Sequence, residues 1–109
     1  FLSLKIPKID IVIVNLYPFI KYSKYLKSSE AIEMIDIGGP SLLRAAGKNY
    51  KFITPIIDKN DYEKLVLNLK KNQGHTDEIF RKKMAFKVFR ETSNYDQLIS
   101  KWFNETKKK

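Results

Sequence analysis

The sequence predicts an α/β domain with a mainly parallel sheet. Two apolar segments, at 9–15 and 50–58, have the composition of strands, and helical patterns occur at 41–49 and 60–72. Strands that alternate with helices are typical of α/β layers in which the strands run parallel. Because two strands are too few for such a sheet, we expect its other strands to precede Phe1 in a longer protein.

The first strand belongs to the run IDIVIVNLYPF at 9–19. Its Ile and Val residues do not alternate with polar residues, which is typical of a strand buried on both faces. Pro18 lacks a backbone N–H and is expected to end this segment. In the second strand, YKFITPIID at 50–58, Pro55 is unusual for a central position.

Two helices are expected between these strands. The segment 21–35 starts as a polar loop and continues as a short helix, with Ser28 or Ser29 as its N-cap. The segment 41–49 has the pattern of a second helix. Pro40 falls in its first turn, where a missing N–H costs nothing.

Two further helices follow the second strand. The segment 60–72 is amphipathic, and Gly74 comes just after its end. Thr76 is expected to cap a longer helix over 76–103, with Asp77 in its first turn. We interpret the aromatic residues of this last helix as core: Phe80, Phe86, Phe89, Trp102 and Phe103.

Length and composition exclude several classes of protein. With 109 residues, 43% of them hydrophobic, the chain has material for one domain. The absence of cysteine excludes disulfides, thiolate metal sites and cysteine nucleophiles. There is no apolar run of the length of a membrane span and no signal-peptide pattern, so we expect a soluble protein.

The formal net charge of +9 raises the possibility of nucleic-acid binding. The 21 basic residues are spread along the whole chain, and only three of them are arginines: Arg44, Arg81 and Arg90. A dedicated nucleic-acid binder usually concentrates Arg and Lys on one face, with base-reading residues beside them. Nucleic-acid binding is therefore the less favoured interpretation.

The segment IDIGGPSLLRAAGKN, at 35–49, has the composition of a ligand site. Gly38 and Gly39 allow a ligand to approach the backbone closely. The helix that follows offers N–H donors and the positive end of its dipole, which suit an anion or a carbonyl oxygen. Asp36 precedes this helix and Lys48 ends it.

The end of the first strand adds Asn15 and Tyr17 to this site. Ligands of parallel α/β sheets bind beyond the carboxyl ends of strands, so Asn15, Tyr17, Asp36 and Lys48 are candidates to converge on one crevice. A structural explanation stays open beside this one. Gly-Gly-Pro is often a plain turn, and Asp36 and Lys48 would then only stabilise the two ends of the helix.

Four segments in order, NLYPF, EAIEMIDIGGPSLLRAAGKN, DYEKL and YDQLI, carry a family resemblance. Between about Ile9 and Phe103 the chain resembles the IMP cyclohydrolase domain of bifunctional purine biosynthesis proteins, which couple AICAR formyltransferase to IMP cyclohydrolase. The resemblance implies a methylglyoxal-synthase-like three-layer fold, of which residues 1–109 are the C-terminal portion. The family's N-terminal phosphate-binding segment and its formyltransferase domain are absent from this sequence.

The resemblance also implies roles for individual residues. The expected reaction is cyclisation of formyl-AICAR to inosine monophosphate with loss of water, in a cytoplasmic homodimer and without a metal or organic cofactor. Lys48 would transfer the proton, and Tyr17 and Asp36 would be the other catalytic residues. Nucleotide contacts are implied for Val14, Asn15, Asp36, Ile37 and Gly38.

The sequence departs from the family at a few positions, and two alternatives stay open. Gly47 stands where alanine is usual, and Glu91 stands where histidine is common. One alternative is a non-catalytic nucleotide-sensing module of the same superfold, since fold alone does not fix activity. The other is a basic nucleic-acid-binding protein.

Overall fold

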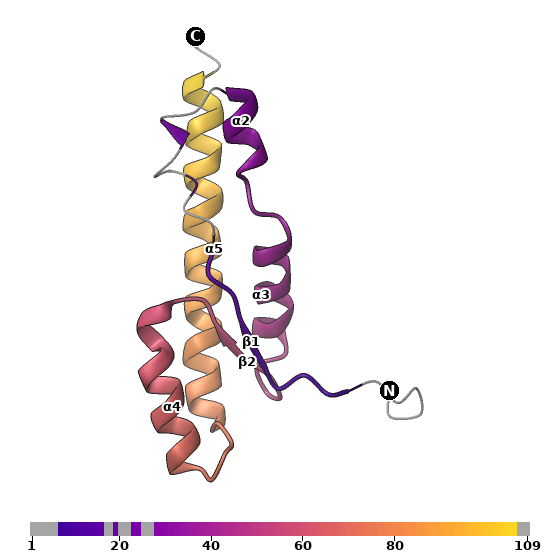
Figure 1. Ribbon diagram of the computed structural model, residues 1–109, viewed down its shortest axis with the longest axis vertical. Helices are drawn as coiled ribbons and strands as arrows, with labels where there is room; N and C mark the ends of the chain where they lie inside the picture. Colours follow the sequence, from indigo (N-terminus) through magenta and orange to yellow (C-terminus); the bar gives the residue numbers. More distant parts are fainter. Residues whose placement is uncertain (1–6, 17–18, 20–22, 25–27, 107–109) are drawn as a thin grey trace.

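The computed structural model describes residues 7–16, 19, 23–24 and 28–106 of the chain. Figure 1 shows an elongated arrangement in which one long helix runs beside all the other elements. In chain order the elements are β1 (Ile11–Ile13), α2 (Ser28–Glu33), α3 (Gly38–Lys48), β2 (Thr54–Ile56), the 3-10 turn η2 (Lys59–Asp61), α4 (Tyr62–Lys71) and α5 (Glu78–Thr106).

The two strands pair in parallel, as the sequence predicts. Ile11 lies opposite Thr54, and Ile13 lies opposite Ile56. The pairing is extended at both ends, because the Thr54 N–H donates to the Asp10 carbonyl at 2.8 Å and the Val14 N–H donates to the Ile56 carbonyl at 3.0 Å. The α/β class with a parallel sheet is confirmed, although each strand is three residues long and shorter than predicted.

Pro55 has a simple place in this sheet. The backbone groups of Thr54 and Ile56 face β1, so the nitrogen and carbonyl of Pro55 between them face the opposite edge of β2. The missing N–H therefore costs no bond to β1, and it makes this edge of β2 unsuited to another strand. Within the described sheet, β2 is an edge strand.

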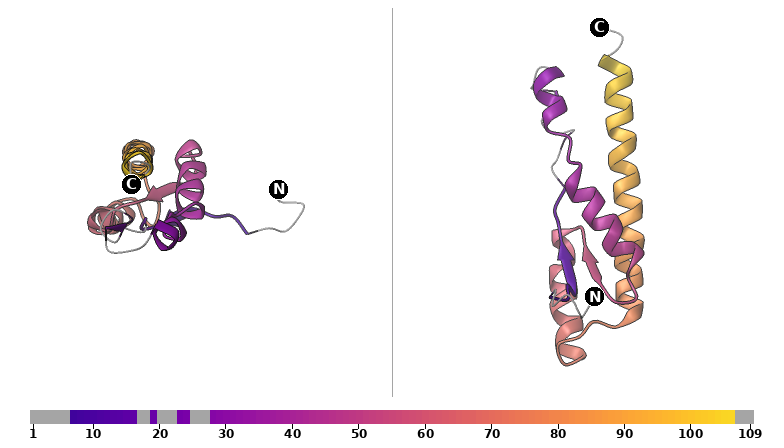
Figure 2. Two further views of the ribbon diagram at one scale, coloured as in Figure 1. Left: turned by 90° about the horizontal axis from the view of Figure 1, so that it is seen from above. Right: turned by 90° about the vertical axis from the view of Figure 1, so that its right-hand side faces the viewer.

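Burial of β1 differs from the prediction. Ile9, Ile11 and Ile13 have exposed fractions of 62%, 36% and 48%, whereas all three residues of β2 are buried. Helices α3 and α5 lie on the same side of the strands (Figure 2). The apolar run was predicted to be buried on both faces, and this is wrong for the part of the chain described, because no described element covers the Ile11 and Ile13 side chains.

Helix α5 contributes to each of three apolar clusters and so joins the layers. The first joins β2, α4 and α5 through Ile56, Leu65, Phe80 and Met84. The second joins α3 and α5 through Leu43, Ile57 and Val88, with Val14 and Leu16 packed against it. The third joins α2 to the second half of α5 through Phe19, Ala31 and Tyr95, with Leu16, Met34, Ile35, Ile99 and Trp102 against it.

The predicted aromatic core of α5 is only partly correct. Phe80 is buried, and Trp102 packs edge-on against Phe19 at 5.4 Å between ring centroids. Phe86, Phe89 and Phe103 are exposed by 63%, 40% and 48%. A single face of a helix meets the core, and these three residues fall outside that face.

The helix ends show which capping predictions hold. Gly74 has a φ of 90° after α4, and its N–H donates to the Leu69 carbonyl at 2.7 Å, as expected of a helix-ending glycine. The cap of α5 was predicted wrongly. The Asp77 carboxylate, not Thr76, accepts the Phe80 N–H at 2.7 Å, because the Thr76 hydroxyl is bonded to the Thr54 hydroxyl.

In α2, both candidate caps lie inside the helix. The helix begins at Ser28, so Ser28 and Ser29 belong to its first turn and are not its N-cap. The residue before Ser28 lies outside the described residues.

Candidate functional site

Asp36 is held from two directions at the start of α3. Its carboxylate Oδ1 accepts the Gly39 N–H at 2.8 Å, which satisfies one of the free donors at the helix start. Its own backbone N–H donates to the phenol oxygen of Tyr95 at 2.8 Å. Asp36 is half-buried, so its carboxylate is fixed in place and still reachable from solvent.

The two glycines beside Asp36 differ in what they allow. A Cβ at Gly39 would lie 2.6 Å from Oδ2 of Asp36, so a side chain there would displace the carboxylate. A Cβ at Gly38 would meet nothing within 4 Å. Contact with the Asp36 carboxylate therefore explains why residue 39 is a glycine. Ile37 is 72% exposed, and together with Gly38 it presents open backbone to solvent.

Tyr95 is a contributor that the sequence did not reveal. It lies on α5, is buried, and is separated from Asp36 by 59 residues. Burial raises the pKa of the Tyr95 phenol, so the group is neutral at ordinary pH and can accept the Asp36 N–H. The YDQLI segment carried the family resemblance, but nothing local linked its tyrosine to Asp36.

The end of β1 lies next to this segment. Leu16 packs against the same cluster as Met34 and Ile35, which directly precede Asp36, and it also packs against the cluster around Leu43. Val14 is half-buried in the same cluster. These shared clusters bring the end of β1 close to the segment that leads into α3.

Asn15 lies at the surface beyond the end of β1. Its amide Nδ2 donates to the phenol oxygen of Tyr62, the first residue of α4, at 3.2 Å. Tyr17, which was predicted to be catalytic, lies outside the described residues.

Lys48 lies at the other end of α3. The helix is uninterrupted over 11 residues, which makes it about 16 Å long at 1.5 Å per residue. Lys48 is exposed and leads through 49–53 into the start of β2, at the amino ends of both strands. The predicted convergence of Lys48 with Asp36 is therefore wrong within a single chain, because one straight helix separates them.

Comparison with known proteins then identifies the family. Residues 46–109 match the family model described as AICARFT/IMPCHase bienzyme. The chain belongs to this family. It is 48% identical over 103 residues to the bifunctional purine biosynthesis protein PurH of Leuconostoc mesenteroides, covering 93% of the chain and 20% of that relative. It is 50% identical over 105 residues to PurH of Lactobacillus acidophilus, covering 94% of the chain and 20% of that relative.

The resemblance to the AICARFT/IMPCHase family seen in the sequence is thereby confirmed. A solved structure, titled crystal structure of ForH, matches this chain with a TM-score of 0.79 and 29% identity, over 94% of this chain and 54% of that one. The chain spans about a fifth of the length of the PurH relatives it matches.

This AICARFT/IMPCHase family chain also has an ion-pair cluster after β2 that the sequence did not reveal. The Asp61 side chain is 1% exposed, and the Lys87 ammonium lies 2.6 Å from its Oδ2. Two more residues extend the cluster: the Lys64 ammonium lies 3.6 Å from Oδ1 of Asp61, and Oδ2 of Asp58 lies 3.9 Å from the Lys87 ammonium. The cluster ties α5 to the start of α4, and so it fixes Tyr62, which contacts Asn15.

The described part of the chain contains neither a metal-binding cluster nor a membrane-spanning helix. Across the ranges described above, no three His, Cys, Asp or Glu side chains lie close enough to hold a metal ion. Among the same residues, no helix is both long and apolar enough to cross a bilayer.

Proposed function

We propose that this chain acts in purine biosynthesis, as the part of an IMP cyclohydrolase domain that binds the base and reacting groups of formyl-AICAR. The proposal is supported above all by one observation: Leu16, just beyond the carboxyl end of β1, packs against the same cluster as Met34 and Ile35, which directly precede Asp36 and the open backbone at Gly38. That is where parallel α/β sheets bind their ligands. Family membership supports the assignment.

In the proposed reaction, the carboxamide nitrogen of formyl-AICAR attacks the carbon of its formyl group. A carbon–nitrogen bond forms, the carboxamide nitrogen and the formamide nitrogen each lose one proton, and the formyl carbon–oxygen bond breaks so that the oxygen leaves with these protons as water. Because both groups belong to one molecule, much of the barrier is met by holding them in contact. No metal or organic cofactor is required by this chemistry.

Asp36 is suited to orient the nucleophile. Its Oδ1 is occupied by the Gly39 N–H, which leaves Oδ2 to accept the carboxamide N–H. That contact would place the nitrogen and raise its electron density. Tyr17 would donate a hydrogen bond to the formyl oxygen as charge develops there.

Lys48 needs a different explanation if it transfers the proton. A lysine side chain reaches about 6 Å from its Cα with standard bond lengths, which is much less than the length of α3. We therefore propose that Lys48 acts on the nucleotide bound by a second copy of the chain. A homodimer with two-fold symmetry would supply one lysine to each site.

Other parts of the site are proposed to come from outside this chain. The nucleotide phosphate would bind a preceding segment that also supplies the further strands, and a formyltransferase domain would make formyl-AICAR. We accordingly expect the isolated chain to be inactive.

The test uses the full-length protein that contains this chain. Lys48→Gln should lower kcat for cyclisation by about 10²–10⁴ while nucleotide binding persists. Lys48→Arg keeps the charge but does not release a proton near neutral pH, so it should bind the nucleotide at least as well as Lys48→Gln and still have a low kcat. A near-normal kcat for Lys48→Gln would return this residue to a purely structural role.

Mixed dimers test the shared site. Subunits carrying Asp36→Asn and subunits carrying Lys48→Gln are each expected to be inactive alone. Random mixing should restore about a quarter of wild-type activity, because half of the dimers would contain one intact site of two. No recovery in demonstrably mixed dimers would contradict the shared site and leave the nucleotide assignment standing.

The separation of Asp36 from Lys48 also favours a second candidate function. A nucleotide-sensing module needs the binding residues but no proton-transfer group. Such a module would bind inosine monophosphate in the full-length protein with equal affinity before and after Lys48→Gln, and would show no turnover in either form.

A further inference from the structure

A groove lies between α4 and α5, and most of the residues that line it belong to α5. It has a volume of about 510 Å³ and an apolar base formed by Ile79, Met84 and Phe86 of α5. Met84 is 5% exposed, whereas Ile79 and Phe86 are 73% and 63% exposed. None of these residues belongs to the proposed nucleotide site. We call this feature the α4–α5 groove.

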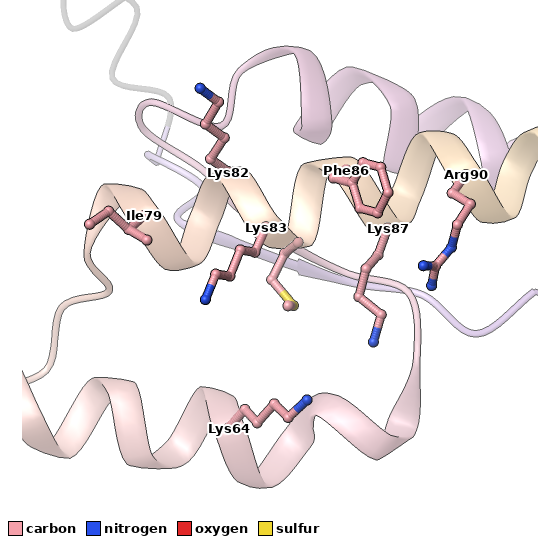
Figure 3. A pocket seen from close by; sticks show the side chains of 8 residues that line it. Lys64, Ile79, Lys82, Lys83, Phe86, Lys87 and Arg90 are labelled. Atoms are coloured by element: carbon pink, nitrogen blue, oxygen red, sulfur yellow. The ribbon is translucent and has the colours of Figure 1, made fainter.

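The α4–α5 groove is bordered by positive charge. Figure 3 shows Lys64 of α4 pointing into the space between the helices, with Lys83 and Lys87 pointing toward it from α5. Lys82 and Arg90 complete the lining. The Lys87 charge is balanced by buried Asp61, and Arg90 pairs with Glu91 at 3.1 Å. Lys64 also lies 3.6 Å from Asp61, and Lys87 lies 3.9 Å from Asp58, so the net positive charge of the rim comes from Lys82 and Lys83.

The charge of the groove restricts what can occupy it. In a two-fold contact through this groove, a second copy would bring its own Lys82 and Lys83 against these lysines, and repulsion between like charges disfavours that occupant. An acidic occupant is favoured by charge complementarity. The exposed apolar base requires that this occupant also present apolar side chains.

A nucleic acid fits the α4–α5 groove less well than a peptide. Single-stranded nucleic acids stack their bases on open aromatic rings. Phe86 is the aromatic residue of the groove, and the Arg90 guanidinium lies over its ring, 5.3 Å from the centroid. One face of the ring is therefore already covered.

We propose that the α4–α5 groove docks an acidic amphipathic helix of a partner protein. Apolar side chains of that helix, spaced i, i+3 and i+7, would pack on Ile79, Met84 and Phe86. Carboxylates beside them would pair with Lys82 and Lys83. Binding of a helix in a groove between two helices is a recurring mode of recognition, and this site is independent of the proposed nucleotide site.

The test measures binding to the full-length protein that contains this chain by fluorescence anisotropy. The probe is a synthetic helical peptide with leucines at i, i+3 and i+7 and glutamates on both sides of them. Replacing both lysines, Lys82→Glu with Lys83→Glu, should weaken its binding at least about tenfold, since each reversal turns an attraction into a repulsion. Phe86→Ala should weaken it several-fold, because the ring is exposed and can be removed without opening the core.

A matched control carries Lys51→Glu with Lys101→Glu, which changes the net charge equally at exposed positions outside the groove. It should weaken binding less than threefold, and circular dichroism should show that all variants remain folded. Polyglutamate and oligothymidine serve as competitors. The proposal would be overturned if the peptide does not bind, or if polyglutamate binds as tightly as the peptide or oligothymidine binds more tightly than it. Equal losses of peptide affinity in the control and the groove variants would also overturn it.

Discussion

Replacing Lys87 with methionine should destabilise the chain strongly, because it leaves a buried carboxylate without its counter-ion. The Lys87 ammonium lies 2.6 Å from Asp61, whose side chain is 1% exposed. The other oxygen of Asp61, Oδ1, is buried without a hydrogen-bond donor among the described residues, and Lys64 is 3.6 Å away. Methionine keeps most of the apolar stem and removes the charge.

The expected cost can be worked from this geometry. Breaking a buried ion pair by removing one partner costs about 3–5 kcal/mol. Lys87 is 22% exposed, so water can partly solvate the carboxylate that remains, and we expect about 3 kcal/mol, the lower end of that range. With a denaturant slope of about 1.5 kcal/mol per M, the urea midpoint should fall by about 2 M.

The assay is urea unfolding of the 109-residue chain, followed by circular dichroism. Lys82→Met is the matched control, since Lys82 is an exposed lysine on the same helix, and it should change the free energy of unfolding by less than about 0.5 kcal/mol. Adding Asp61→Asn to Lys87→Met should recover part of the loss, because it removes the uncompensated charge. If Lys87→Met and Lys82→Met have equal midpoints, the ion pair does not stabilise the fold and the reasoning is refuted.

Two further predictions concern α3 and α5. Gly39→Ala should lower the unfolding midpoint and shift the NMR signals of Asp36, because the new Cβ would lie 2.6 Å from the carboxylate. Gly38→Ala should leave stability unchanged or raise it by up to about 1 kcal/mol, because its Cβ would meet nothing. Equal effects of the two alanines would contradict the steric explanation. Hydrogen bonds, first from the Phe80 N–H and then from Asn68, lower the pKa of Asp77. Its contribution to stability is therefore complete above the pKa of an unfolded aspartate, about 3.9, and is lost as the pH falls through the lower folded-state value. Acid unfolding of Asp77→Asn should show a shallower pH dependence over that interval than the wild type, and identical slopes would exclude this role.

The sequence by itself determined the elements and the family. Hydrophobic periodicity located α3, α4 and α5, and apolar runs rich in isoleucine located both strands. The alternation of strands and helices predicted the parallel pairing. The separation of Asp36 from Lys48 could also have been predicted from the sequence. A continuous helix over 38–48 fixes it by the rise per residue, and convergence would have required a break that Gly47 does not make.

Only the tertiary structure decided what holds the site in place. The hydrogen bond from Asp36 to Tyr95 spans 59 residues, and the pair of Lys87 with Asp61 spans 26. Tertiary contacts also decided that Asp77 rather than Thr76 caps α5, since the Thr76 hydroxyl is taken by Thr54 of β2. Helix and strand periodicity arises from the local geometry of the backbone, so short sequence windows contain it. Contacts between distant segments depend on how whole elements pack against one another, and no local pattern records that.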